Sequence, residues 1–214
     1  MTEYRLDLSK VPPELHRIVK AWYAWQEVYL RKLGKYPGQE QRAPKAWESA
    51  EQVFWGARPP EIIDECDLAI SDSSGESYYL SAQDGVYYID ETERGSRGRY
   101  WMFRKLEDAE KGLLFLLSQA ARPGKYSDSP RYRWSEQGLN ADVYLHKPDP
   151  ENFPGRVVMT VDHEPVDRGW MGENDAIPFS HAITLTYDEL NRTVREGVPS
   201  DWFTIDVVSD ADSI

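Results

Sequence analysis

Ser77-Tyr-Tyr-Leu-Ser-Ala-Gln-Asp-Gly-Val-Tyr-Tyr-Ile-Asp-Glu-Thr92 is the stretch that decides the fold. Its two halves are aromatic and β-branched runs, and Asp84-Gly85 between them supplies the positive φ angles that a tight hairpin needs. Arg94-Gly-Ser-Arg-Gly98 then predicts a second turn, which leads into a third strand at Arg99–Arg104. Apolar residues recur at helical spacing from Leu106 to Ala121. The sequence therefore predicts a three-strand antiparallel meander closed by a helix.

A second firm signal lies near the start of the chain. The apolar residues of Leu15–Leu33 recur with a helical period, and Gly34 marks the end of the predicted helix. Its wide aromatic stripe is typical of a helix that packs against its own domain. We expect an α+β fold, an antiparallel sheet meander with packed helices, in which an N-terminal helical segment (1–60) packs on an α+β domain (61–214) as one compact unit.

The remaining elements are predicted from shorter signals. Breaker residues make Arg122–Pro130 a surface loop, and Ile62–Ile70 is ambiguous between strand and short helix. The other expected elements are a short strand or an ordered arm at Thr2–Ser9, a helix at Pro44–Trp55, strands at Ala141–His146, Arg156–Asp162 and Phe179–Leu185, and a helix from Thr186 to about Glu196.

The composition fits a protein of the reducing interior of a cell. The 214 residues are enough for a substantial core, and the single cysteine, Cys66, cannot form an internal disulfide. No apolar segment follows Met1-Thr-Glu-Tyr-Arg5, so we expect no signal peptide. The longest apolar run, Gly112–Leu117, is far shorter than the roughly 18 residues of a membrane span. We therefore expect a cytoplasmic protein without a membrane partner.

Negative charge is concentrated in one part of the chain. The formal net charge is −12, from 37 acidic and 25 basic residues, which argues against a nucleic-acid partner. Pro59–Glu93 contains no Lys or Arg, and the arginines that follow are expected to pair with some of its acids across the sheet. The remaining carboxylates, beside exposed tyrosine, predict a partner-binding face made of Glu76, Tyr78, Asp84, Tyr87, Asp90, Glu91 and Glu93.

Familiar catalytic signatures are absent from the sequence, which has no phosphate loop, dinucleotide fingerprint or nucleophile elbow. The best enzyme-like cluster is Asp162-His163-Glu164 with His181, because an imidazole beside carboxylates can act as a general base or metal ligand. If the preceding strand continues, Asp162 and His163 point to opposite faces and share no site. Cys66 lies among acids, which disfavour a reactive thiolate. We therefore expect no catalytic residue, metal or cofactor.

Several segments together resemble one known family. They are Gly85–Gly95, the aromatic strand Tyr100–Phe103, the helix Leu106–Leu117 that ends near Arg122, and the later Phe179–Leu185 with Asp188-Glu-Leu190. In this combination they resemble the immunity factors that neutralise tuberculosis-necrotizing-toxin-like NAD glycohydrolases. The resemblance implies an antitoxin that binds a cognate bacterial toxin and blocks its active-site cleft, without catalysis of its own.

The charge of the chain fits such a partner. A cleft that binds the pyrophosphate of NAD is usually cationic, so an acidic protein with projecting tyrosines would be steered to it. Two alternatives stay open. One is a small hydrolase that uses Asp162, His163, Glu164 and His181, and the other is an acidic adaptor or structural subunit that docks through its tryptophan-rich first helix.

Overall fold

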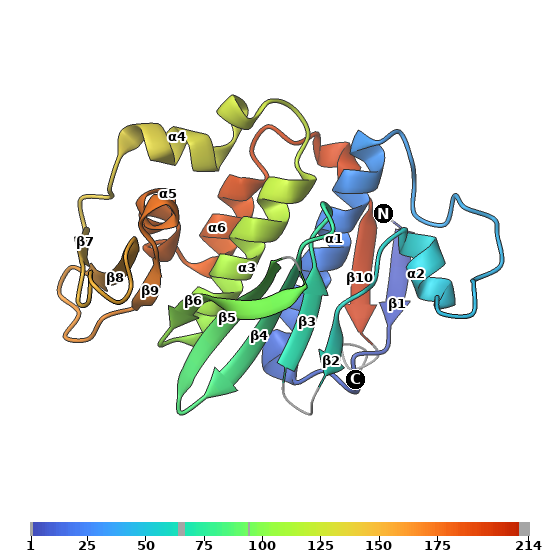
Figure 1. Cartoon of the computed structure of the whole chain (residues 1–214). Helices are drawn as coiled ribbons and strands as arrows, with labels where there is room; N and C mark the ends of the chain where they lie inside the picture. The colour runs from blue at the N-terminus through green and yellow to red at the C-terminus, as the bar shows by residue number, and fades with distance from the viewer. Residues whose placement is uncertain (1, 64–66, 94, 210–214) are drawn as a thin grey trace. The chain divides into compact units, whose positions relative to one another are not determined.

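The computed structural model describes residues 2–63, 67–93 and 95–209 and has an α+β fold (Figure 1). The predictions about Cys66 and Arg94 therefore lie outside the described residues. The helices are α1 (His16–Lys32), α2 (Ala50–Trp55), α3 (Leu106–Ala121), α4 (Pro130–Gln137), α5 (Glu173–Ile183) and α6 (Tyr187–Val194), with 3-10 turns at Pro13–Leu15, Tyr126–Asp128 and Ser200–Trp202. None of the helices in these ranges has the length and hydrophobicity that would let it cross a bilayer.

The strands form one parallel pair and one antiparallel sheet. They are β1 (Thr2–Leu6), β2 (Glu61–Ile63), β3 (Asp67–Ser71), β4 (Ser77–Gln83), β5 (Val86–Glu93), β6 (Ser96–Phe103), β7 (Val143–His146), β8 (Arg156–Val161), β9 (Gly169–Gly172) and β10 (Ile205–Ser209). Within the described chain, β1 pairs with β10, and the hydrogen-bonded order of the sheet is β2-β3-β4-β5-β6-β9-β8-β7.

The chain divides into two compact units, which are described separately. The first unit comprises Met1–Tyr78, Leu116–Pro123 and Val198–Ile214, and the second comprises Tyr79–Phe115 and Gly124–Gly197. The boundary that the sequence suggests near residue 60 falls inside the first unit.

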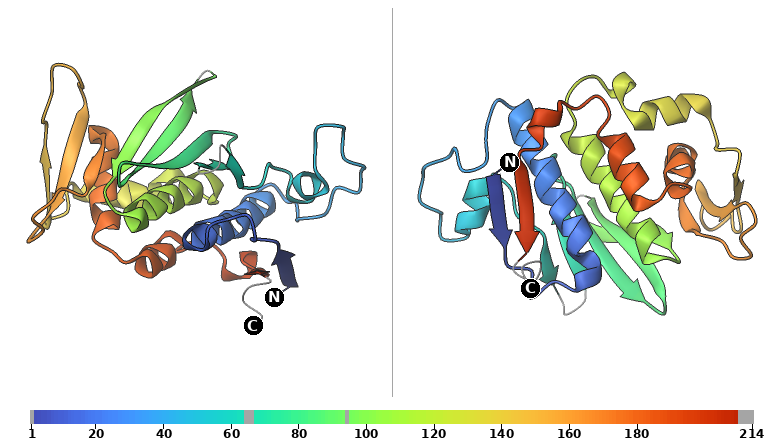
Figure 2. Two further views of the ribbon diagram at one scale, coloured as in Figure 1. Left: turned by 90° about the horizontal axis from the view of Figure 1, so that it is seen from below. Right: turned by 180° about the vertical axis from the view of Figure 1, so that it is seen from behind.

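The first unit is built around the aromatic stripe of α1. Trp22 and Trp25 are each only 1% exposed, as the stripe predicts, and the ring of Trp22 lies edge-on to the buried Trp55 of α2. The expected second helix is shorter than Pro44–Trp55, because its N-cap is Ser49, whose hydroxyl accepts a hydrogen bond from Gln52 N. Figure 2 shows β1 beside β10, so of the two readings of the N-terminal segment, short strand or ordered arm, the strand is the one observed.

A buried carboxylate fixes β10 in this unit. Glu27 of α1 is fully buried and accepts hydrogen bonds from the backbone N–H groups of Thr204 and Ile205, both at 3.0 Å. Arg31, one helical turn later, donates to the same carboxylate at 2.9 Å. Because every partner of this charge is close and well placed, its burial is compensated.

The second unit contains the predicted meander. Asp84 and Gly85 adopt φ values of 52° and 77° at the β4–β5 turn, and β5 pairs antiparallel with β6. Helix α3 covers these strands closely at Gly112, where an added Cβ would lie 3.0 Å from Ile89 and 3.1 Å from Phe103. The meander and its covering helix are thus confirmed.

One prediction about the second unit is wrong. Phe179–Leu185 was expected to be extended, but residues up to Ile183 belong to helix α5. Phe179 is fully buried, with its ring 5.6 Å from those of Trp101 and Phe103, so tertiary packing decides the conformation. The expected surface loop Arg122–Pro130 is present and exposed at residues 124–128. Its last residue, Pro130, already belongs to the first turn of α4, whose N-cap is Ser129.

We predict that Gly169→Ala destabilises the protein strongly. Gly169 has a φ of 137°, and an added Cβ would lie 2.0 Å from the carbonyl oxygen of Met102 on the neighbouring strand. Backbone strain alone costs about 1–3 kcal/mol, and the clash adds to it. Chemical denaturation measures the loss. Gly98→Ala in β6 is the matched control, since open space surrounds its Cβ; equal stability of the two variants would contradict the prediction.

Candidate functional site

The predicted acidic face is only partly exposed. Asp84 at the hairpin tip and Glu76 before β4 are exposed, whereas Tyr87 and Glu91 of β5 are half-buried and Tyr78 is only 5% exposed. Glu93 lies opposite Ser96 in β5–β6, and its side chain is outside the described part of the structure. Glu76 and Tyr78 belong to the first unit and the others to the second. A partner-binding role for these residues stays a prediction.

Asp90 has a structural role in the hairpin. It is 6% exposed, and its carboxylate accepts hydrogen bonds from Arg97 Nε at 2.7 Å and from Arg99 Nη1 at 3.0 Å. This confirms the expected pairing between acidic and basic strands. Because two arginines of β6 neutralise it, Asp90 braces β5 against β6 and contributes little to an unpaired negative face.

The enzyme-like cluster lies at the rim of a hollow of about 520 Å³ in the second unit. Asp162, His163 and Glu164 line it, together with residues of α3 and the α5–α6 connection. Strand β8 ends at Val161, so the condition for placing Asp162 and His163 on opposite faces is not met. His163 adopts a φ of 64°, and its Nε2 lies 3.0 Å from Asp162 Oδ2. The His163 side chain is 92% exposed.

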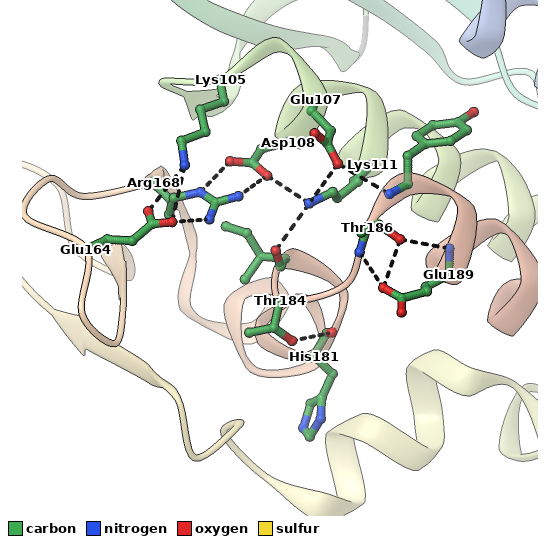
Figure 3. A network of polar contacts seen from close by, with 12 residues as sticks. Lys105, Glu107, Asp108, Lys111, Glu164, Arg168, His181, Thr184, Thr186 and Glu189 are labelled. Carbon is green, nitrogen blue, oxygen red and sulfur yellow. Dashed lines mark hydrogen bonds and ion pairs between the residues drawn. The ribbon is translucent and has the colours of Figure 1, made fainter.

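Lys105, Lys111, Glu164 and Arg168 line this hollow and belong to a network of ion pairs that continues beneath it (Figure 3). Asp108 of α3 is fully buried and accepts two hydrogen bonds from Arg168, at 2.6 Å to Oδ2 and 2.5 Å to Oδ1. Lys111, one turn later on α3, donates to Asp108 at 3.2 Å and to the carbonyl of Ile183 at 3.2 Å. Arg168 also contacts Glu164 at 2.9 Å. The network ties α3 to the β8–β9 connection and to the end of α5.

The pKa of Arg168 reflects its contact with Asp108. Burial alone would lower the pKa of the Arg168 guanidinium, but the hydrogen bond and charge of Asp108 outweigh it and raise that pKa. The charge of Arg168 is therefore stabilised where it lies, against Asp108. Lys105, at the rim, completes the network by donating to Glu164 at 3.2 Å.

His181 does not join the cluster. Its Nε2 lies 2.8 Å from the carbonyl oxygen of Gly138, and its ring stacks on Trp134 at a centroid distance of 5.8 Å. Figure 3 shows the imidazole directed away from Lys111 and Arg168. The four residues named together in the hydrolase alternative are therefore not gathered in one place. Among the residues that the structure describes, no group of three or more His, Cys, Asp or Glu is placed to hold a metal ion.

The sequence interpretation missed the centre of this site. Asp108 and Lys111 have the i,i+3 spacing of a helical ion pair, but Glu107 has the i,i+4 spacing to the same lysine, so the sequence alone does not single out the buried partner. Their partner Arg168 lies 60 residues away from Asp108, and no local pattern connects the two.

Comparisons with known proteins leave the family open. No protein-family model matches the chain, and no curated protein matches it. A solved structure of Rv3902c from M. tuberculosis is similar over 63% of this chain and 77% of its own, with 15% sequence identity and a TM-score of 0.45. A similarity of that size carries no argument about function.

We predict that Asp108→Asn lowers the free energy of unfolding by about 3–5 kcal/mol, because Arg168 and Lys111 would keep their charges without the buried counter-charge. Urea denaturation followed by tryptophan fluorescence measures the change. Glu107→Gln is the control: the neighbouring carboxylate also faces Lys111, at 3.6 Å, but its side chain is 47% exposed. A loss no greater in Asp108→Asn than in Glu107→Gln would show that the network is not a stabilising centre.

Proposed function

We propose that this protein is an immunity protein, an antitoxin that binds a cognate bacterial NAD glycohydrolase toxin and blocks its active-site cleft without catalysis of its own. The resemblance of Gly85–Gly95, Tyr100–Phe103 and Leu106–Leu117 to immunity factors of this kind supports the proposal. The net charge of −12 suits a partner with a cationic cleft.

The observation that carries the proposal is how the ionisable groups of the second unit's hollow are used. Asp108, Arg168 and Lys111 hold one another in the interior, and Glu164 is held by Arg168 and Lys105. Such closed pairing stabilises a fold but leaves these groups poorly placed to exchange protons with a substrate. An inhibitor needs a stable surface and no reactive group.

Exposed acids would guide the toxin towards this protein. Asp84 lies at the hairpin tip and is exposed, as is Glu76. The carboxylate of Asp90, in contrast, is already paired with Arg97 and Arg99. Long-range attraction between an acidic protein and a cationic cleft raises the association rate more than it strengthens the final complex.

One observation keeps the hydrolase alternative open. The Nε2–Oδ2 distance of 3.0 Å between His163 and Asp162 is that of a hydrogen-bonded pair beside a hollow. The adaptor alternative has less support, because Trp22 and Trp25 of the first helix are already buried in the core and offer no surface to a partner.

Co-expression tests the proposal. The wild-type chain should relieve the toxicity of the protein encoded by the adjacent gene, preserve cellular NAD and co-purify with that protein. His163→Ala should protect equally well, because the side chain is exposed and contacts only Asp162 among the described ion pairs. NAD depletion despite the wild-type chain would refute the antitoxin function, and loss of function in a stable His163→Ala variant would favour the hydrolase.

Association kinetics test the steering. Reversing Glu76 and Asp84 to Lys should lower the association rate with the toxin about tenfold at low salt, with a smaller change in the dissociation rate. The difference should shrink at physiological salt, where the Debye length is about 8 Å. Asp90→Lys is unsuitable here, since it breaks the pairs with Arg97 and Arg99. A rate independent of salt and of both reversals would show that these acids do not guide the encounter.

A further inference from the structure

The strands β7, β8 and β9 of the second unit have two different faces. One face is apolar and buried, and helix α5 packs against β8 and β9 on that side. Its residues are Val143, Val157, Met159 and Met171, each no more than 2% exposed. Figures 1 and 2 show no described helix on the other side of β7 and β8.

The residues of this other side follow from the register. Tyr144 lies opposite Thr160, and His146, Val158 and Trp170 form a row across the three strands. Because alternate residues of a strand share a face, Arg156 of β8 lies on the same side as Val158. Its guanidinium stands 3.6 Å from the ring centre of Trp170 and 4.5 Å from that of Phe153. We call this set, Tyr144, His146, Phe153, Arg156, Val158, Thr160 and Trp170, the outer face.

The outer face exposes large aromatic side chains. Tyr144 is 57% exposed and Phe153 is 48% exposed, while the ring of Trp170 lies against Arg156 and is half-buried. Tyrosine, tryptophan and arginine are the residues most enriched at the energetic centres of protein interfaces. An exposed group of these residues on a rigid sheet is therefore characteristic of a binding surface.

The loop that carries Phe153 is held in place before any partner arrives. The N–H of Phe153 donates to the carbonyl of Asp149 at 2.9 Å, and Arg156 N donates back to Phe153 O at 3.2 Å. Asn152 donates to the Asp149 carboxylate from its backbone N–H at 3.1 Å and from its side-chain amide to both oxygens at 3.0 Å. A loop already ordered by its own hydrogen bonds loses little entropy when it binds.

The charges around the outer face indicate the sign of the charge that a partner surface should carry. Its edge and the β7–β8 loop carry four carboxylates, Asp142, Asp149, Glu151 and Glu173, against the permanent cations Lys147 and Arg156. Lys147 is paired with Glu173 at 2.8 Å, and Arg156 is covered by aromatic rings. Asp142 and Glu151 are exposed at opposite ends of the region. An aromatic centre with an acidic rim is complementary to a protein surface that is basic around an apolar contact.

We propose that the outer face of β7–β9 is the surface on which the toxin docks, with Tyr144 and Phe153 as the anchors that leave water on binding. This inference rests on the proposed function, and it assigns the lasting contact to a part of the chain different from the acidic hairpin. The hairpin acids then govern the encounter, and the outer face governs how long the complex lives.

The test uses the protein encoded by the adjacent gene as the probe and measures both co-purification and the dissociation rate. The double variant Tyr144→Ser/Phe153→Ser should fold normally, because both side chains are substantially exposed. It should dissociate about 30-fold faster than wild type, the factor that corresponds to the loss of one interface hot spot. Tyr126→Ser is the matched control, since Tyr126 is an equally exposed tyrosine (52%) of the same unit on a 3-10 turn.

The possible results separate the two claims. Faster dissociation in the double variant, with Tyr126→Ser unchanged, supports the outer face. If the wild-type chain protects and binds while the double variant dissociates at the wild-type rate, the outer face is not the docking surface and the antitoxin function stands. If the wild-type chain neither binds nor protects, the proposed function fails, and this inference fails with it.

Discussion

The buried carboxylate of Asp108 is the interaction on which the second unit depends. It holds Arg168, whose backbone N–H donates to Met159 O at 2.8 Å and whose carbonyl accepts from Arg104 N at 3.1 Å. Arg168 therefore lies immediately before Gly169, the first residue of β9, and β9 pairs with β6 on one side and β8 on the other. Since only a residue without a side chain fits beside Met102, the carboxylate and the glycine together fix the register of β9. The first unit uses the same device, in which Glu27 holds the start of β10.

This arrangement explains how a chain with so many acids builds two cores. The buried carboxylates of Glu27, Asp90 and Asp108 are compensated by arginine or backbone N–H groups, and those of Glu27 and Asp108 link elements that are distant in sequence. Removing one partner of such a pair is costly, because the other charge would stay buried without compensation. Other acids, such as Glu76 and Asp84, are exposed to solvent.

Local signals in the sequence were sufficient for the elements that depend on local chemistry. Asp84-Gly85 predicts the hairpin, and the periodic apolar residues of α1 and α3 predict helices. Both signals depend only on residues that are close in sequence. Helix α5 was missed because Pro178 and Ile183 favour extended structure, and only burial of Phe179 against distant strands makes it helical. The ion-pair network and the outer face were missed for the same reason, because both join segments that only the fold brings together.

The parallel pairing of β1 with β10 has a consequence for how the chain folds. Thr2 lies opposite Ile205 and Leu6 opposite Ser209, so the two strands of this pair are separated by almost the whole sequence. Bringing such distant segments together carries a loop-closure cost that local contacts repay only once the intervening chain is compact, which slows the step. The β1–β10 pair should therefore form last, after the meander has folded. A newly made chain would become resistant to proteases only after this late step.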